Sequence, residues 1–313
     1  MLRFVGQRLA GLLVALLLVS VLVFAALNIL PGDPAAVMLG TSAQPDTLAA
    51  LRAEMGLDRP VVERYGAWML GILQGDFGTS TTYGVPVSSL IANRLTVTLP
   101  LAGLAIALSL LVALPLAVAA ANRPGRSVDR FVMLFAQAGV ALPNFWIGLL
   151  LILVFAARWR IAPAGGFPGW DAGIGPALGA LALPAVALAI PQAAILTRVA
   201  RTAILDVVSD DFVRTARAKG VSRRRALWRH VLPNAMIPVV TILGLQFSYL
   251  LGGAILVENV FALPGLGQLA YQSMMQRDLL TLQSVALLLA AFVIVVNLLV
   301  DLSYAALDPR LTR

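Results

Sequence analysis

The sequence predicts an all-α integral membrane protein with six transmembrane helices and both termini in the cytoplasm. Of its 313 residues, 60% are hydrophobic and only 12% are charged, whereas an average soluble domain has roughly 25% charged residues. The hydrophobic residues gather in long runs, and about 20 apolar residues in a helix suffice to cross the hydrocarbon core of a bilayer. The basic residues concentrate in some of the connecting segments, which indicates how the chain is oriented.

The composition also excludes several classes of function. The chain has no Cys and one His, so disulfides, thiolate metal sites and cysteine nucleophiles are ruled out and imidazole chemistry is poorly supplied. The sequence contains no G-x-x-x-x-G-K-[ST], H-E-x-x-H or G-x-S-x-G motif. We therefore expect a protein that is not an enzyme, with no catalytic, metal or cofactor site. The net charge of +8 is better explained by membrane topology than by nucleic-acid binding.

The first apolar run, Leu9 to Leu30, is longer than the apolar region of a signal peptide and is expected to remain as a span. In LPGDPA, which follows it, Asp33 suits a helix cap and Pro34 a first helical position. The chain up to Arg94 is mixed and polar and predicts a small external module. Five residues at helical spacing predict an amphipathic helix that lies on the membrane face or on the bundle: Tyr65, Trp68, Met69, Ile72 and Leu73.

The remaining chain alternates apolar runs with short connections. GDFGTS, Gly75 to Ser80, is typical of a turn or loop. The third span is interrupted at Pro143, and the segment from Glu258 to Leu280 is expected to be a loop. The predicted spans after the first are Leu95–Ala121, Phe131–Ala157, Ala177–Thr197, Met236–Val257 and Thr281–Ala306. The chain thus divides into residues 1–94, the first helix with its external module, and residues 95–313, a five-helix core with a cytoplasmic loop at 198–235.

The distribution of basic residues predicts the orientation of the chain in the membrane. The termini and the connections at 122–130 and 198–235 carry 16 of the 23 Lys and Arg residues. With six spans these segments share one side, which the positive-inside rule places in the cytoplasm. The segment between the first and second spans then faces outward.

The segment from Ser209 to Pro233 carries seven of those 23 basic residues between apolar runs. It predicts two short helices: Ser209 caps the first, Gly220 ends it, and Ser222 caps a second that Pro233 breaks. Packing positions are expected at Phe212, Ala216, Leu227 and Val231. Arg223, Arg224 and Arg225 crowd the start of the second helix, where cations are disfavoured; they are expected to meet acidic groups of a partner, or lipid headgroups, or to do no more than hold the loop inside.

Uncharged polar groups within the spans indicate a transport path or interhelical hydrogen bonds. They include Gln137, Gln192, Ser248 and Asn297, and Asp301 is the clearest ionisable group. Bent helices place polar and aromatic groups at mid-depth in spans three and five, so the candidates for the path are Asn144, Phe145, Gln246, Phe247 and Tyr249. Helix packing is the alternative role for each. The scarcity of charge argues against proton relays, but an ion-gradient-driven secondary carrier remains a second class of function.

The chain carries GDFGTS, PNFWIG and DFVRTARAKG in this order. These motifs resemble those of bacterial ABC importer permeases, and in particular the dipeptide, oligopeptide and nickel branch. Ala216, Gly220, Leu232 and Pro233 fit the cytoplasmic signature E-A-A, three residues, G, nine residues, I-x-L-P. Arg214 and Thr215 stand where the signature has E-A, and His230 where it has I. The further motifs are LPGDPA, LIANRLTVTLPLA, LLGGAILVENVFALPGLGQL and NLLVDLSYAALDPRL.

This resemblance implies a type I importer fold in the bacterial inner membrane, with this chain as half of a path for di- or oligopeptides. It implies a second, related permease subunit in a heterodimer, two ATPase subunits that bind ATP and Mg, and an external solute-binding protein. Nickel chelate or glutathione are alternative substrates. The helix that couples to an ATPase would be carried by Asp211, Phe212, Arg214, Thr215, Ala216, Lys219 and Gly220.

Overall fold

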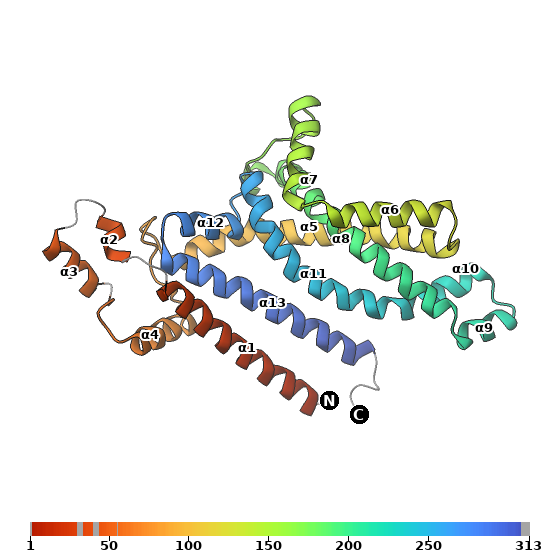
Figure 1. The fold of residues 1–313 in the computed structure, drawn as a ribbon, viewed down its shortest axis with the longest axis horizontal. Coiled ribbons are helices and arrows are strands. Elements are labelled where there is room, and N and C mark those ends of the chain that lie inside the picture. The colour runs from red at the N-terminus through yellow and green to blue at the C-terminus, as the bar shows by residue number, and fades with distance from the viewer. Residues whose placement is uncertain (1, 30–33, 40–43, 55, 308–313) are drawn as a thin grey trace. The chain divides into compact units, whose positions relative to one another are not determined.

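The computed structural model describes residues 2–29, 34–39, 44–54 and 56–307. These residues form helices joined by turns and loops, and the described part contains no β-strand beyond one isolated bridge between Thr79 and Pro86. The predicted all-α class is therefore confirmed (Figure 1). Leu30 to Asp33 of the LPGDPA motif and residues 308–313 of the tail lie outside the described residues.

Five helical stretches among the described residues are long and apolar enough to cross a membrane. A sixth results if α6 and α7, which meet at a sharp bend, are counted as one span. The six predicted spans agree with this upper number, while the number itself and the side of the termini stay predictions. The five stretches lie in α1 (Leu2–Ile29), α5 (Val87–Asn122), α8 (Ile174–Val208), the run from Arg223 to Val260 that ends in α11 (Leu232–Val260), and α13 (Leu279–Leu307).

The chain forms two compact units, one of residues 6–98 and 264–295 and the other of residues 1–5, 99–263 and 296–313. The first is called the α4 unit, after the helix described next, and the second the core unit. The predicted division between residues 94 and 95 stays a prediction.

In the α4 unit, the predicted amphipathic helix is α4 (Val61–Leu73), and it packs on α1. The Tyr65 ring lies 5.4 Å from Phe24 of α1 and 6.1 Å from Trp68. Tyr65 Oη and Ser20 Oγ share a hydrogen bond of 2.8 Å. Two short helices precede α4: α2 (Pro34–Leu39), which begins at Pro34 as predicted, and α3 (Pro45–Glu54).

The predicted loop from Glu258 to Leu280 is wrong in its middle, because α12 (Leu266–Met275) forms there. Leu266 and Leu269 are fully buried against Val87 and Ile91 of α5, so tertiary packing stabilises a helix too short to stand alone. The GDFGTS segment is a loop, as predicted. Its Ser80 hydroxyl donates to the buried carboxylate of Asp278 at 2.5 Å, which ties the loop to the chain after α12.

In the core unit, α6 (Ser127–Ala141), α7 (Asn144–Leu151) and α11 all pack against α8. The predicted interruption at Pro143 is confirmed, since α6 and α7 diverge by 100° at this point (Figure 1). Leu142, before the proline, is extended with φ −91° and ψ 127°, the conformation that a following proline favours. After α7 come the π-helical turn η2 (Ile152–Arg158) and the short 3₁₀ turn η3 (Trp170–Ala172).

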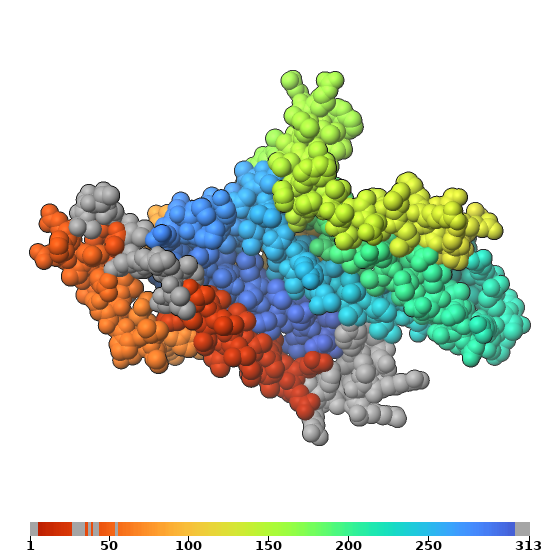
Figure 2. All heavy atoms as spheres, in the orientation of Figure 1, coloured from red at the N-terminus to blue at the C-terminus, as the bar shows by residue number. Residues whose placement is uncertain are grey.

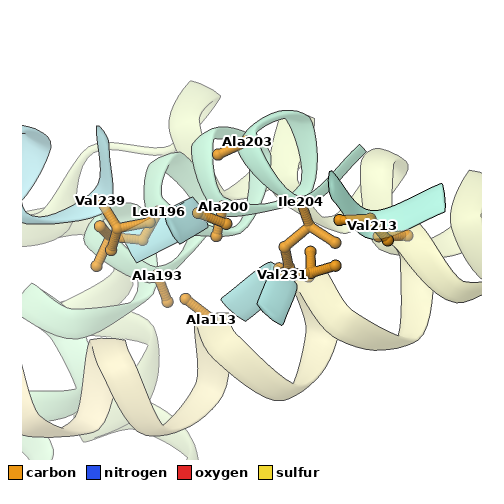
Figure 3. Close-up of a cluster of buried hydrophobic side chains, with 12 residues drawn as sticks. Ala113, Ala193, Leu196, Ala200, Ala203, Ile204, Val213, Val231 and Val239 are labelled. Carbon is orange, nitrogen blue, oxygen red and sulfur yellow. The ribbon is translucent and has the colours of Figure 1, made fainter. Parts of the chain in front are cut away.

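A cluster of small and branched side chains is buried between α5, α8 and α11 of the core unit (Figure 3). Ala193, Leu196, Ala200 and Ile204 line one face of α8 and are almost completely buried. Ala113 of α5 packs against them, because alanine lets neighbouring helix backbones approach closely. The predicted coupling segment, residues 209–233, packs against this cluster.

Candidate coupling and translocation sites

The first predicted coupling helix is α9 (Asp211–Ala218), which follows directly on α8. The prediction that Ser209 caps it is wrong. Helix α8 continues to Val208, and the Ser209 hydroxyl donates to the Asp206 carbonyl at 2.7 Å in its last turn. Asp210, with φ −67° and ψ 148°, occupies the N-cap position of α9 instead.

The end of α9 is confirmed at Gly220, whose φ of +88° belongs to the left-handed region that glycine adopts without a side-chain clash. The Gly220 N–H donates to the Arg217 carbonyl at 3.0 Å, and the Val221 N–H to the Ala216 carbonyl at 3.2 Å. These two bonds make the Schellman arrangement that closes a helix tightly. The short helix is therefore held by its own backbone at this end.

One side chain fixes α9 to the core unit. Val213 is 3% exposed and joins the buried cluster with Ile204 of α8 and Val231, as Figure 3 shows. Ala216, one turn on, is half-buried, in agreement with the prediction. Phe212 was also expected to pack but is 44% exposed, because Val213 occupies the inward position. The spacing of Val213 and Ala216, three residues apart, was the signal that could have revealed this anchor.

The other predicted coupling residues lie on the solvent side of α9. Arg214 Nη1 is 3.6 Å from Asp211 Oδ1, and both side chains are exposed, so this pair contributes little stability. Figure 2 shows α9 and the next helix, in turquoise, at an exposed end of the core unit. The exposed members of the predicted set are Asp211, Phe212, Arg214, Thr215, Lys219 and Gly220.

The second predicted helix begins as expected. Ser222 caps α10 (Arg223–Ala226), with its Oγ accepting from the Arg225 N–H at 3.4 Å. The prediction that Pro233 ends this helix is wrong, since α10 continues through the π-helical turn η4 (Leu227–Val231) into α11. Pro233 lies in the first turn of α11, after this wider turn, and Asn234 Nδ2 donates to the His230 carbonyl at 2.7 Å. The π turn directly precedes Pro233, which has no backbone N–H to donate to the preceding turn.

The packing of this second segment follows the prediction. Val231 is 1% exposed and Leu227 packs on the same cluster as Val213. Ala226 is also buried. Both halves of the coupling segment are therefore fixed to one apolar base formed by α5, α8 and α11.

An ion pair that the sequence analysis missed links α6 to α8. Arg201 Nε donates to Asp129 Oδ1 at 2.5 Å, and Arg201 Nη2 donates to Oδ2 at 2.6 Å. The Gly125 N–H also donates to Oδ2, at 2.7 Å. Asp129 is buried, and such a two-pronged pair is geometrically specific. The only available signal was an acidic residue beside a basic loop, because residues 72 apart in sequence give no local pattern.

The translocation candidates of span five differ in how much of each side chain is exposed. Gln246 of α11 is 4% exposed and its Nε2 donates to the Gln192 carbonyl of α8 at 3.0 Å. Within the described residues, the Oε1 atoms of Gln246 and Gln192 are buried without a hydrogen-bond partner. Phe247 is half-buried, and Tyr249 is 75% exposed.

The span-three candidates lie at the α6–α7 break. Asn144 is half-buried, its Oδ1 accepts from the Phe145 N–H at 2.8 Å, and its amide packs against Gly253 of α11. Phe145 is 39% exposed. Asn144 and Gln246 thus contact neighbouring helices, which matches the alternative role of helix packing, while a role in a path stays a prediction for all five candidates. Among the described residues there is no group of three or more His, Cys, Asp or Glu that could hold a metal ion.

Two family descriptions together match nearly the whole chain. Residues 113–313 match the binding-protein-dependent transport system inner membrane component, and residues 1–102 match the N-terminal part of such components. A probable peptide ABC transporter permease of Sinorhizobium fredii is 38% identical over 308 residues, 98% of each chain. The glutathione transport system permease of Salmonella typhimurium is 41% identical over 311 residues, 99% of each chain. A putative peptide transport system permease of Brucella abortus is 39% identical over 305 residues, 97% of each.

Two solved transporters share the fold. The inward-facing methionine transporter MetNI aligns with a TM-score of 0.58 at 19% identity, over 70% of this chain and 96% of that chain. The crystal structure of an amino acid ABC transporter with histidines aligns with a TM-score of 0.51 at 21% identity, over 69% of this chain and 92% of that chain. The predicted importer permease fold is therefore confirmed. The chain belongs to the family of binding-protein-dependent transport system inner membrane components and is a multi-pass protein of the bacterial inner membrane.

Proposed function

We propose that this chain is the permease subunit of an ATP-driven importer and forms half of the membrane path for di- or oligopeptides. Relatives that align over 97% or more of both chains include permeases named for peptide transport. The function classes excluded by composition agree with this proposal, since a conduit needs neither a nucleophile nor a cofactor of its own.

The observation that carries the coupling role is the construction of α9. Its inner side is anchored through Val213, its end is closed at Gly220, and its outer side is free to meet a partner. A short rigid helix of this kind transmits displacement to α8 and α11 because all three share one buried cluster. An ATPase subunit that binds one state of the membrane helices better than the other shifts the equilibrium between them.

We assign ATP and Mg to two ATPase subunits, and we assign substrate delivery to an external solute-binding protein. A second, homologous permease subunit completes the path. Asn144, Phe145, Gln246, Phe247 and Tyr249 are the proposed contributions of this chain to that path. They carry no formal charge, which suits a conduit that tolerates varied peptides while the binding protein selects among them.

Glutathione is a second candidate substrate, because a permease named for glutathione transport is 41% identical over 99% of both chains. Glutathione is itself a short peptide, so the same uncharged path would serve. Nickel chelate, expected from the branch as a whole, has no such relative among those described above.

Uptake into proteoliposomes tests the proposal. The chain is copurified with its ATPase, partner permease and binding protein, and accumulation of labelled dipeptide, pentapeptide and glutathione is measured with ATP supplied on the ATPase side. We expect uptake of one of these substrates that requires ATP and Mg. Uptake that survives ATPase inactivation and collapses when the proton or sodium gradient is removed would instead identify a secondary carrier.

A further inference from the structure

An apolar groove of about 790 Å³ runs along the outside of the core unit, between α5, η4 and α11. This volume is within the roughly 300–1,000 Å³ of typical small-molecule pockets. Its walls are aliphatic, and Asn122 and Trp228 are the polar side chains that line it. Because α5 and α11 are candidate spans, the groove lies where an acyl chain of the bilayer is the available occupant. Its aliphatic walls include Leu110, Leu114, Val118, Leu232 and Met236.

Trp228 joins this groove to a second, shallow pocket of opposite character. That pocket is lined by Trp228 together with Ser222, Arg224, Arg225 and Arg229. The Trp228 side chain is 60% exposed, although its neighbours Ala226 and Val231 are buried. Tryptophan favours the headgroup level of a membrane, where its ring is apolar and its N–H is hydrated. Trp228 thus marks a boundary between the apolar groove and the basic pocket.

The arginines of the basic pocket have no side-chain partner among the residues that the structure describes. Arg223, by contrast, donates from Nη2 to the Asn122 carbonyl at 2.7 Å. In the part of the chain that the structure describes, no side-chain hydrogen bond or ion pair involves Arg224, Arg225 or Arg229, and all three are exposed. No Asp or Glu lines either pocket. Three uncompensated guanidinium groups at the end of an apolar groove complement a ligand with an anionic head and an apolar tail.

We propose that this surface binds one anionic phospholipid, with an acyl chain in the groove and its phosphate on Arg224, Arg225 and Arg229. Basic residues at the cytoplasmic membrane surface attract anionic lipid, and the predicted topology puts this pocket there. The lipid would brace the α10–η4–α11 turn that carries the second half of the coupling segment. The proposal does not depend on which solute is transported.

Lipid retention on the purified protein tests it. The complex containing the full chain is reconstituted in nanodiscs of phosphatidylcholine with phosphatidylglycerol, extracted in mild detergent, and the retained lipid is counted by native mass spectrometry. The first variant is Arg224→Gln with Arg225→Gln and Arg229→Gln. Its matched control removes three exposed arginines of the other predicted cytoplasmic connection: Arg123→Gln, Arg126→Gln and Arg130→Gln.

We expect the first variant to lose apparent affinity for phosphatidylglycerol on the order of 100-fold, given about 1 kcal/mol for each basic group, while the control keeps it. A second variant, Ala119→Phe, fills the groove from an exposed position and leaves every charge in place. It is expected to release the lipid as well, whereas Val112→Phe, exposed on α5 but outside the groove, is not.

Four outcomes would overturn the proposal. Equal lipid loss in the variant and its arginine control would show that lipid retention depends on net charge and not on this pocket. Retention of lipid in Ala119→Phe would show that the groove does not hold the acyl chain. Displacement by inorganic phosphate alone would identify a free-anion site. Loss of the copurified ATPase with lipid retention unchanged would assign the arginines to that subunit.

Discussion

The guanidinium of Arg201 on α8 donates two hydrogen bonds, of 2.5 and 2.6 Å, to the carboxylate of Asp129 on α6. This pair fastens the start of α6 to α8, close to where α8 leads into α9. The start of α6 is therefore tied to the helix that leads into α9.

Asp129→Asn is expected to destabilise the protein, because it leaves the partly buried Arg201 without its counter-charge. Breaking one member of a buried pair typically costs about 3–5 kcal/mol. The measurement is the melting temperature of the purified complex in detergent. Adding Arg201→Gln to Asp129→Asn removes both charges and should recover part of the loss, and an unchanged melting temperature in the single variant would contradict this account.

Gly220→Ala is expected to loosen the end of α9 without unfolding the chain. A side chain at φ +88° costs about 1 kcal/mol, although nothing lies within 4 Å of the added Cβ. ATPase copurification and ATP-driven uptake should both fall. Gly84→Ala is the matched control, since Gly84 has φ +65° and equally open surroundings. Equal effects of the two changes on ATPase copurification would refute a specific role for Gly220.

Ala216→Asp is expected to disrupt ATPase docking while membrane insertion stays intact. Ala216 is half-buried between the anchored side of α9 and its exposed side, so a carboxylate there adds charge and volume at the border of the proposed contact. Pull-down of the ATPase with the membrane-extracted chain measures the effect. Ala50→Asp, on an exposed position of α3, serves as the control. Normal ATPase recovery together with normal uptake in Ala216→Asp would count against the coupling assignment.

Val213→Ala separates the anchor of α9 from its contact surface. The change removes two buried carbon atoms at a position that is 3% exposed and is expected to cost about 2 kcal/mol. No group on the outer side of α9 is altered. We expect uptake per ATP hydrolysed to decline even where the ATPase still copurifies, because the helix no longer moves with α8. An unchanged melting temperature together with unchanged uptake per ATP hydrolysed would show that Val213 does not couple the motion of α9 to that of α8.

Gly253→Ala is expected to displace the side-chain amide of Asn144, since the added Cβ would collide with it. Overpacking of this kind costs about 1–3 kcal/mol. In the background of Asn144→Ala the same change should be nearly neutral. A double-mutant cycle on the melting temperature therefore measures the contact. Additive effects of the two changes would place Asn144 elsewhere, for example facing the path.

Local patterns in the sequence were sufficient for the class of protein and for much of the coupling segment. Apolar runs of spanning length, the break at Pro143, the Ser222 cap and the left-handed Gly220 all follow from preferences of single residues and their near neighbours. These features could be predicted without knowing which residues lie nearby in space, because capping and backbone conformation are decided within a few residues of the chain.

Where local preference and packing disagreed, packing decided. Pro233 was expected to end a helix, but the continuous run from α10 to α11 is stabilised by the burial of Val231. Likewise α12 forms because Leu266 and Leu269 are buried against α5, not because its ten residues are strongly helical.

Contacts between distant residues could not be read from the sequence at all. The Asp129–Arg201 pair joins residues 72 positions apart, and Asn144 approaches Gly253 across more than a hundred positions. Periodicity reports which face of a helix is apolar but not which helix will cover it. The tertiary structure therefore decided how α9 is attached, while the chain's class, its apolar runs of spanning length and the end of α9 at Gly220 followed from the order of its residues.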